Sequence, residues 1–427
     1  MNQEVIKQLI REQEPIRLPD NWVPRTLLNR FEPLLTNNQI IIIKGMRRCG
    51  KSTFMQWVRS KQEANHFYFN FDDDRLVNFT IEDFQTLLLL LIELVGPANI
   101  VFFDEIQNIS GWEKFIRRLH DQRYKIYLTG SNARVFSREL GTHLTGRYIS
   151  MEMYPYAFSE YLIAKHCAIS SYEIVTTEDK ATIKSHFNHY CQVGGIPDYV
   201  CFEQPEYLSD LYESILYRDV VVRHGIVKEQ ALKSLSYYLA SNVGKNISYN
   251  KLKNLLKLAS ATTVSDYCHF LEMSYLCFFI SRYSASLKVQ AHYGKKVYLI
   301  DHALAQRIGF RISEDQGRML ENIVFLELKR RNYEVYFHQE NKECDFVVKE
   351  SHGITQAIQV VVHLEHEEVK KREFDGLKEA MSMYQLKSGL ILTENTEYTE
   401  GNISVMPVWK WLLSDPTLTH KTAHKNL

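Results

Sequence analysis

The sequence predicts an α/β fold, with a parallel sheet in the N-terminal part of its 427 residues and further domains after it. Three observations support this fold class. The apolar run Ile40–Ile43 is followed at once by a glycine-containing loop, and such runs are typical of strands buried on both faces. Two more apolar runs, Ile100–Phe103 and Ile126–Leu128, end in polar residues, and helical stretches separate the runs. Because parallel strands end at a shared edge, the polar residues after them are expected to lie together.

The loop after the first run has the form G-x-x-x-x-G-K-[ST], in the strand–loop–helix setting that a phosphate-binding loop needs. Backbone N–H groups of such a loop point at phosphate oxygens, and the positive end of the following helix adds to the attraction. Lys51 is expected to reach the β- and γ-phosphates, and Ser52 to bind Mg²⁺. The alternative is a turn that binds nothing. The candidate nucleotide-binding residues are Gly45, Met46, Arg47, Arg48, Cys49, Gly50, Lys51, Ser52 and Thr53.

The second run ends in two acids, Asp104 and Glu105. Two acids at a strand end usually indicate only a solvated strand end, but Asp104 follows Lys51 by 53 residues (104 − 51). That spacing leaves room for a helix, a further strand at 66–71 and another helix. We expect the acidic strand to lie beside the loop strand. Asp104 would then hold Mg²⁺ together with Ser52, and Glu105 would polarise the attacking water.

The third run continues into Thr129, Gly130, Ser131 and Asn132. Its polar end is expected at the same edge of the sheet as the loop. Ser131 and Asn132 are therefore candidates to donate a hydrogen bond to the γ-phosphate or to the attacking water. The alternative is that Asn132 stabilises its own turn.

The loop, the Asp-Glu strand and the strand that ends in Thr-Gly-Ser-Asn together resemble the AAA+ branch of ATPases. More narrowly, the chain resembles uncharacterised bacterial and archaeal AAA+ ATPases with a winged-helix segment and a C-terminal nuclease-like domain of unknown function. Besides Gly45–Arg48, the segments Leu144–Arg147, Tyr154–Tyr161 and Gly194–Pro197 support this resemblance, which covers nearly the whole chain.

The resemblance implies roles for individual residues. Asn132 becomes a sensor of the γ-phosphate, and Arg147 becomes a catalytic arginine finger, because a guanidinium can bind phosphate oxygens through two N–H groups. A finger that acts on a neighbouring subunit would require an oligomer. The alternative is that Arg147 pairs with a carboxylate on its own surface. Gly195-Ile196-Pro197 resembles a turn where a lid meets the nucleotide, and Arg25 is expected to flank the adenine.

Four regions are expected along the chain. Residues 1–165 form the AAA+ ATPase core, 166–245 a helical lid, 246–312 a winged-helix-like segment, and 315–427 a small α/β domain. In the third region, the candidate recognition helix Ala261–Ser274 contains no Lys or Arg, although such donors are needed to read base edges. We therefore expect this segment to contact the lid or a protein rather than a DNA sequence.

The last region is similar to the PD-(D/E)XK nuclease fold. Active members bind a divalent metal through an Asp and a Glu or Gln, and a Lys two positions later supports hydrolysis. Glu321, Asp345 and Gln359 match the acid and metal positions, but Val361 stands at the position of the Lys. A valine can neither donate a hydrogen bond nor hold a charge. We therefore expect a nuclease-inactive domain that binds a partner protein or nucleic acid.

The composition limits the partners. Lys and Arg together number 51, as do Asp and Glu, so the whole chain has no electrostatic preference for nucleic acid or membrane. No segment is long and apolar enough to span a bilayer. Seven cysteines without a C-x-x-C pair argue against a disulfide framework and favour a cytoplasmic location.

The sequence thus predicts an ATP-binding, Mg²⁺-dependent ATPase that couples ATP hydrolysis to rearrangement of its lid and C-terminal domains. Its cofactors are ATP and Mg²⁺, its oligomeric state is open, and a protein partner is expected to bind through the C-terminal domain. Two alternatives remain. One is a slow nucleotide-gated switch that recruits a protein or DNA partner, and the other is a DNA nuclease effector, which Val361 argues against.

Overall fold

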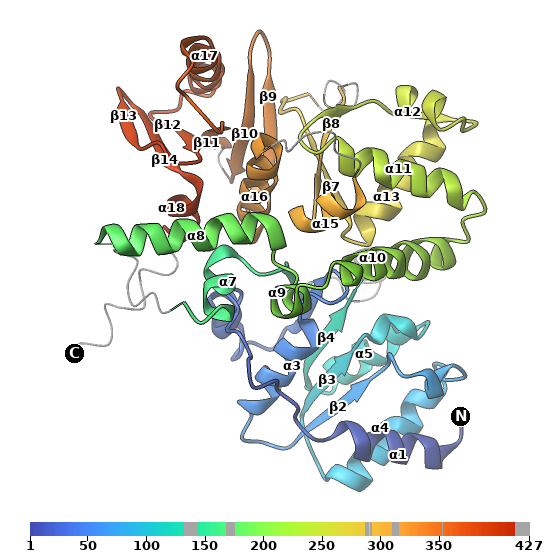
Figure 1. The fold of residues 1–427 in the computed structure, drawn as a ribbon. Helices are drawn as coiled ribbons and strands as arrows, with labels where there is room; N and C mark the ends of the chain where they lie inside the picture. The colour runs from blue at the N-terminus through green and yellow to red at the C-terminus, as the bar shows by residue number, and fades with distance from the viewer. Residues whose placement is uncertain are drawn as a thin grey trace. The chain divides into compact units, whose positions relative to one another are not determined.

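The computed structural model describes residues 1–131, 144, 146–167, 176–286, 290, 293–309, 316–351 and 353–414 (Figure 1). The chain divides into two compact units. Unit 1 contains Met1–Tyr154 and Met273–Tyr275, and unit 2 contains Pro155–Glu272 and Leu276–Leu427. Two units do not separate the four expected regions, so the finer division stays a prediction.

Unit 1 is built on a five-stranded sheet in the order β2-β3-β4-β1-β5. All neighbouring strands are parallel, which confirms the predicted α/β class. The strands are β1 (Ile40–Gly45), β2 (His66–Asn70), β3 (Ile100–Asp104), β4 (Lys125–Gly130) and β5 (Tyr148–Met153). The expectation that the acidic strand lies beside the loop strand is wrong, because β4 pairs with both β1 and β3 and lies between them.

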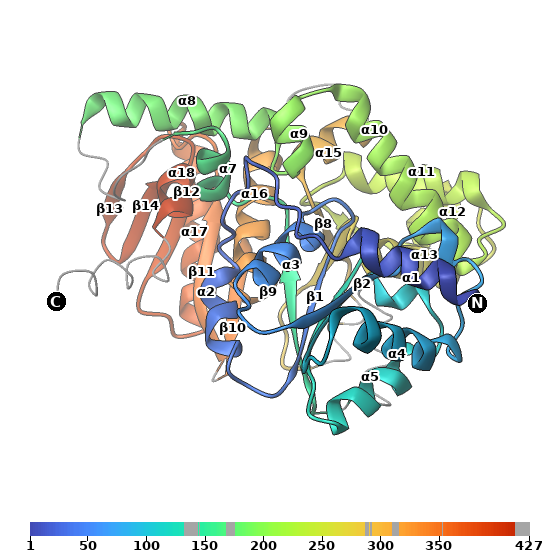
Figure 2. The same ribbon diagram turned by 90° about the horizontal axis from the view of Figure 1, so that it is seen from below.

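Helices cover both faces of this sheet because its side chains alternate between two apolar faces. On one face, alternate residues of the strands pack into a single core with α1 (Gln3–Gln13), α4 (Asp83–Val95) and α5 (Trp112–Asp121). Figure 2 shows α1 and α4 close together in this layer. On the other face, Phe102 and Tyr127 stack, and Phe31 of α2 (Leu28–Phe31) packs against Tyr127 and against Phe54 of α3 (Lys51–Ser60).

Short 3-10 helices complete unit 1 as η1 (Glu32–Leu34), η2 (Asp74–Leu76) and η3 (Ile106–Asn108). The last of these follows β3 directly, so the chain turns sharply immediately after the two acids. This turn determines where the Glu105 side chain lies.

Unit 2 begins with helices, as expected for this part of the chain. They are α7 (Phe158–Ala164), α8 (Thr177–Val193), α9 (Pro197–Phe202), α10 (Pro205–Ser214), the π-helix η4 (Ile215–Val222) and α11 (Glu229–Ser241). Helix α8 starts at a capping box, in which Thr176 and Asp179 each accept a hydrogen bond from the other's backbone N–H. It ends at Gly194, whose φ of 70° is a conformation that favours glycine.

The next part of unit 2 contains the elements expected for the third region. Helices α12 (Tyr249–Leu255) and α13 (Ala261–Met273) precede β7 (Cys277–Ser281) and β8 (Lys295–Leu299). With β6 (Asn246–Ile247), these strands form an antiparallel sheet in the order β6-β8-β7, which we call the small sheet. Helix α15 (His302–Ile308) follows it. The winged-helix assignment itself stays a prediction.

The remainder of unit 2 is a six-stranded mixed sheet in the order β13-β14-β12-β11-β10-β9, which we call the C-terminal sheet. Its strands are β9 (Glu334–Gln339), β10 (Glu343–Glu350), β11 (Gly353–Val360), β12 (Gly389–Thr393), β13 (Tyr398–Glu400) and β14 (Ile403–Pro407). The accompanying helices are α16 (Gln316–Arg330), α17 (Glu367–Met383) and α18 (Val408–Leu413). A nuclease-like identity for this α/β region stays a prediction.

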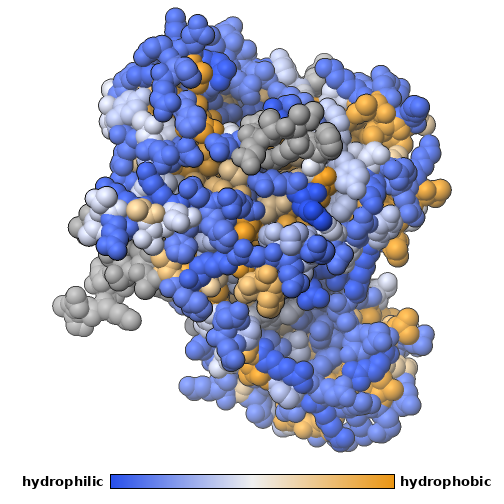
Figure 3. All heavy atoms as spheres, viewed as in Figure 1, coloured by the Kyte–Doolittle hydropathy of each residue, from blue (hydrophilic) through white to orange (hydrophobic). Residues whose placement is uncertain are grey.

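The face of the molecule drawn in Figure 3 is mostly hydrophilic, with hydrophobic side chains in separate patches. In the part of the chain that the structure describes, every helix is too short or too polar to cross a membrane.

Candidate functional site

The loop between β1 and α3 has a shape that requires glycine at both ends. A Cβ atom on Gly45 would lie 2.2 Å from the carbonyl oxygen of Met153 on the neighbouring strand β5. Gly50 has a φ of 99°, and helix α3 starts at the next residue. The backbone therefore turns tightly into the helix N-terminus, where N–H groups without helical partners can bind an anion.

The side chain of Lys51 packs against the backbone of this loop and is shielded from solvent. Its side chain is buried, and its Nζ donates to the carbonyl of Met46 at 3.0 Å and lies 3.5 Å from Oε1 of Glu105. Burial by itself lowers the pKa of Lys51, but the negative charges of Glu105 and Asp104 outweigh it and raise the pKa above its usual value. Lys51 is therefore a fixed positive charge beside the loop.

Asp104, the last residue of β3, is fully buried and accepts three hydrogen bonds. The hydroxyls of Ser52 and Thr129 donate to its carboxylate, and the Tyr68 hydroxyl donates to Oδ2 at 3.3 Å. Burial, together with the charge of Glu105, raises the pKa of Asp104 above its usual value. A carboxylate and a hydroxyl in direct contact offer two oxygen ligands of the kind that Mg²⁺ prefers, so this pair fits the predicted cation.

Glu105 has a left-handed backbone, with a φ of 51°, and its Oε1 lies 3.5 Å from Nζ of Lys51. Its N–H donates to Oγ1 of Thr129 at 3.0 Å, and its Oε2 accepts from the N–H of Ser131 at 3.2 Å. Burial by itself raises the pKa of Glu105, but the Lys51 ammonium and a hydrogen bond from Gln107 outweigh it and lower the pKa. Glu105 is thus held ionised, as a general base requires.

Three residues of this site were missed from the sequence. Thr129 joins the two acids, since its hydroxyl donates to Asp104 and accepts from the N–H of Glu105. Tyr68 contacts Asp104 from the edge strand β2, and Gln107 contacts Glu105. For Thr129, the available signal in the sequence was its position two residues before Ser131, in the polar end of the third strand.

Arg25 forms a hydrogen bond to the backbone of the loop. Its guanidinium is buried and donates to the carbonyl of Cys49 at 2.8 Å and to the carbonyl of Tyr154 at 2.5 Å. Its expected place beside the adenine stays a prediction. Arg47 lies 3.8 Å from Asp72, so this loop residue has a partner outside the loop.

The remaining predicted residues contact other parts of the chain or lie outside the described residues. Arg147 pairs with Asp121 at 2.7 Å, and both side chains are substantially exposed. This is the surface pairing given as the alternative to an arginine finger, which stays a prediction. Asn132 lies outside the described residues. Gly195 belongs to unit 2, where its N–H donates to Asp301 at 2.7 Å and its carbonyl accepts from Tyr156 at 2.6 Å.

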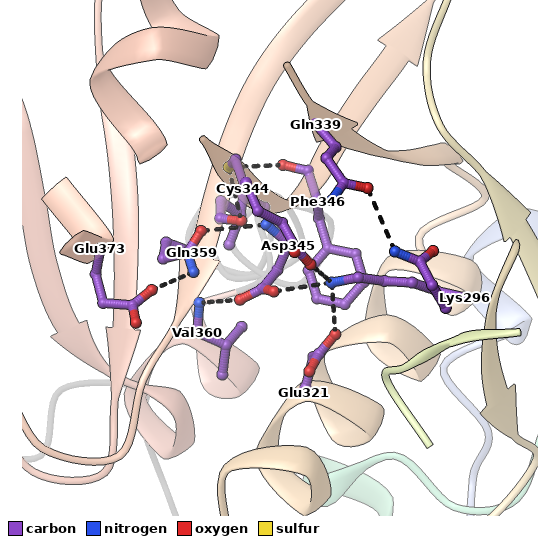
Figure 4. Close-up of polar contacts among 12 residues, drawn as sticks. Lys296, Glu321, Gln339, Cys344, Asp345, Phe346, Gln359, Val360 and Glu373 are labelled. Atoms are coloured by element: carbon purple, nitrogen blue, oxygen red, sulfur yellow. Dashed lines mark hydrogen bonds and ion pairs between the residues drawn. The ribbon is translucent and has the colours of Figure 1, made fainter. Parts of the chain in front are cut away.

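The residues expected at the nuclease-like site come together in unit 2. Lys296 of β8 lies 3.0 Å from Asp345 and 3.3 Å from Glu321, and the side chain of Gln359 accepts from the N–H of Asp345 at 3.1 Å (Figure 4). Val361 is buried in the core of the C-terminal sheet. No group of three or more His, Cys, Asp and Glu side chains among the described residues is arranged to hold a metal ion.

Comparison with known families identifies the class of the N-terminal region. Residues 37–162 match the family described as AAA domain. Residues 184–315 and 316–411 match two domains of unknown function, DUF8612 and DUF4143. The matched AAA segment contains the loop, both acids and all five strands of the parallel sheet.

Two relatives match over almost their whole length. The protein MJ1544 of Methanocaldococcus jannaschii, uncharacterised, is 32% identical over 413 residues, which is 91% of each chain. An uncharacterised protein of Haemophilus influenzae is 31% identical over 391 residues, which is 88% of this chain and 94% of the relative.

Similarity to solved structures is much weaker. The RuvB Holliday junction branch migration motor of Thermotoga maritima is 16% identical, with a TM-score of 0.29, over 68% of this chain and 94% of that one. The Hsp104 complex with casein from S. cerevisiae is 15% identical, with a TM-score of 0.31, over 67% of this chain and 61% of that one. Similarities of this size carry no information on function.

The loop geometry, the parallel sheet and the AAA-domain match together define a P-loop NTPase of the AAA+ class. Within that class the chain belongs to the same family as MJ1544 of M. jannaschii, whose members named here are uncharacterised.

Proposed function

We propose that this protein binds ATP with Mg²⁺ and hydrolyses it at the loop of unit 1. One observation supports this most directly. The four side chains that the reaction needs converge on the loop, since Lys51 lies 3.5 Å from Glu105 and the hydroxyl of Ser52 contacts Asp104. Burying an ammonium and two carboxylates together costs free energy, and arrangements of this kind cluster at functional sites.

Each residue has a task in this reaction. The loop N–H groups and Lys51 bind the phosphates and neutralise their charge, while Ser52 and Asp104 would hold Mg²⁺. The metal, when bound, stabilises the charge that develops on the phosphate oxygens. Glu105 orients water for in-line attack and accepts its proton. Arg147 as a finger and Asn132 as a sensor remain part of the proposal.

A second function, a slow nucleotide-gated switch, is favoured by the contacts of Glu105. Its carboxylate already contacts Lys51, the N–H of Ser131 and the side chain of Gln107. These contacts must be exchanged before Glu105 can activate water, which would slow turnover. In this case ATP binding would rearrange the lid and recruit a protein partner through the C-terminal domain. Comparing single-turnover with steady-state hydrolysis separates a switch from a continuously working ATPase.

The proposed activity is tested with Glu105→Gln. This variant should keep ATP bound and lose about a hundredfold or more in turnover, because an amide cannot accept the proton. Glu93→Gln is the matched control, since Glu93 is an exposed glutamate of unit 1 paired with Lys7 at 3.4 Å. Unchanged turnover in Glu105→Gln would refute the role of Glu105 as base.

A further inference from the structure

A buried lysine from the small sheet points into a group of carboxylates beside the C-terminal sheet (Figure 4). Lys296 of β8 is only 2% exposed. Its Nζ lies 2.7 Å from Glu343, 3.0 Å from Asp345 and 3.3 Å from Glu321. We call these four side chains the ammonium–carboxylate cluster. Its members come from β8, β10 and α16, elements that are far apart in the sequence.

The carboxylates are oriented by bonds that do not involve Lys296. Oδ2 of Asp345 accepts the N–H of Val360 at 3.0 Å, so its Oδ1 faces the ammonium. Oε1 of Glu321 accepts the hydroxyl of Tyr298 at 2.6 Å. The positions of these two carboxylates are therefore determined by the surrounding backbone and side chains, and they would persist if the lysine were shortened.

The approach of Glu321 also depends on a glycine. A Cβ atom on Gly244 would lie 2.6 Å from Oε2 of Glu321. The φ of Gly244 is 75°, and its N–H donates to the carbonyl of Val297 at 2.9 Å. A residue with a side chain here would displace the Glu321 carboxylate, so the backbone leaves room for this acid beside the lysine.

The charge of the cluster is unbalanced. One ammonium faces three carboxylates, and each contributes an oxygen within 3.3 Å of a single point, the Nζ atom. Mg²⁺ and Mn²⁺ also bind carboxylate oxygens, but at about 2.0–2.2 Å, and the described His, Cys, Asp and Glu side chains form no group that is arranged to hold such an ion as they stand. An ammonium needs longer contacts, and the observed distances suit hydrogen bonds from nitrogen.

We propose that the Lys296 ammonium occupies the position of a divalent cation in this domain, and that Lys296 and such a cation exclude each other. The protein then binds no metal at the cluster, and the charge of Lys296 joins the small sheet to β10 instead. Removing the ammonium leaves three convergent carboxylates, whose mutual repulsion a divalent cation relieves.

The test is a titration of the nucleotide-free full-length protein with Mn²⁺ alone, followed by calorimetry and by electron paramagnetic resonance. Lys296→Met should gain one Mn²⁺ site that is about tenfold or more tighter than any binding by the unchanged protein. Adding Asp345→Asn to Lys296→Met should remove that site. Lys295→Met is the matched control, because successive residues of a strand face opposite sides and Lys295 is less buried.

Two outcomes would overturn the proposal. One is that Lys296→Met binds Mn²⁺ no better than Lys295→Met. The other is that the unchanged protein already has a Mn²⁺ site that Asp345→Asn removes. Neither result bears on ATP binding, because no nucleotide is present and the loop is unchanged in every variant.

A second measurement applies if Lys296→Met fails to fold. In the unchanged protein, acetic anhydride should acetylate Lys296 about tenfold or more slowly than Lys295, because the ammonium of Lys296 is buried and held by carboxylates. Millimolar Mn²⁺ should leave this ratio unchanged. Equal acetylation of the two lysines, or exposure of Lys296 by Mn²⁺, would overturn the proposal.

Discussion

Thr129 provides a sharp test of the nucleotide site, because a single hydroxyl connects both acids. The substitution is Thr129→Val, which keeps the branched shape of the side chain and replaces the hydroxyl by a methyl group. Asp104 then loses a hydrogen-bond donor, and the N–H of Glu105 loses its acceptor at 3.0 Å. Thr129 is fully buried, so water cannot easily replace these bonds.

The expected size of the effect follows from these two bonds. A hydrogen bond to a charged group contributes about 1.5–3 kcal/mol, and each 1.4 kcal/mol corresponds to a factor of about ten. Turnover of ATP with Mg²⁺ should therefore fall about tenfold to a hundredfold in Thr129→Val. The free energy of unfolding should fall by about 1–2 kcal/mol, because a buried N–H is left unpaired.

The assay is phosphate release at saturating ATP over a range of Mg²⁺ concentrations. We expect Thr129→Val to need more Mg²⁺ for half-maximal turnover, since Asp104 is less firmly held. Thr129→Ser keeps the hydroxyl and serves as the control, with turnover within about threefold of the unchanged protein. The reasoning is refuted if folded Thr129→Val hydrolyses ATP as fast as Thr129→Ser.

Three further predictions concern Asp104 of unit 1, Glu321 of unit 2 and Arg147. Because the pKa of Asp104 is raised in the folded protein, its contribution to stability is lost as the pH rises from 3.8 through its pKa in the folded state. In a thermal melt of the nucleotide-free protein at pH 7–8, Asp104→Asn should therefore raise the Tm by about 2–4 °C. The same substitution should abolish Mg²⁺-dependent hydrolysis. Burial raises the pKa of Glu321 from 4.5 to about 7, so the free energy of unfolding should fall by at most about 3 kcal/mol as the pH rises from 4.5 through 7. In urea denaturation at pH 5 and pH 8, Glu321→Gln should lose less of its free energy of unfolding between the two pH values than the unchanged protein. An identical loss in both proteins would contradict this prediction. The exposed ion pair of Arg147 and Asp121 contributes at most about 1 kcal/mol to the free energy of unfolding, so either residue can be replaced without unfolding the protein. If Arg147 acts as an arginine finger, Arg147→Ala should lose ATP turnover while Asp121→Ala keeps it. Equal turnover in the two variants would remove Arg147 from the mechanism.

The loop and the two acids could be predicted because their signals are contiguous in the sequence. Gly50 is required by its own backbone conformation and Gly45 by the close approach of Met153 on β5, and Lys51 follows directly. The sheet class was equally accessible, since three apolar runs alternate with helical stretches. The match to the AAA domain over residues 37–162 confirms the predicted class of this region.

The contacts between strands could not be predicted in the same way. The order of strands places β4 between β1 and β3, and this order is not determined by any local pattern. Thr129 contacts both acids only because β4 lies there. The same holds for Tyr68, which reaches Asp104 from β2 although 36 residues separate the two.

The C-terminal region shows a related difficulty. Glu321 and Asp345 were identified from their place in a predicted helix and strand, and they do lie together. Lys296 was not identified, because it precedes Asp345 by 49 residues and belongs to a strand of another sheet. A search for a lysine two positions after Gln359 finds Val361 and misses an ammonium that arrives from elsewhere in the fold.

The most direct measurement of the central claim is a calorimetric titration of ATP into nucleotide-free protein, with Mg²⁺ and again with EDTA. We expect the unchanged protein to bind ATP, Mg²⁺ to strengthen the binding, and Lys51→Ala to weaken it about tenfold or more. Lys61→Ala, at the exposed end of the same helix, should bind as the unchanged protein does. If the unchanged protein shows no Mg²⁺-dependent affinity for ATP or any other nucleoside triphosphate, the assignment of the loop is contradicted.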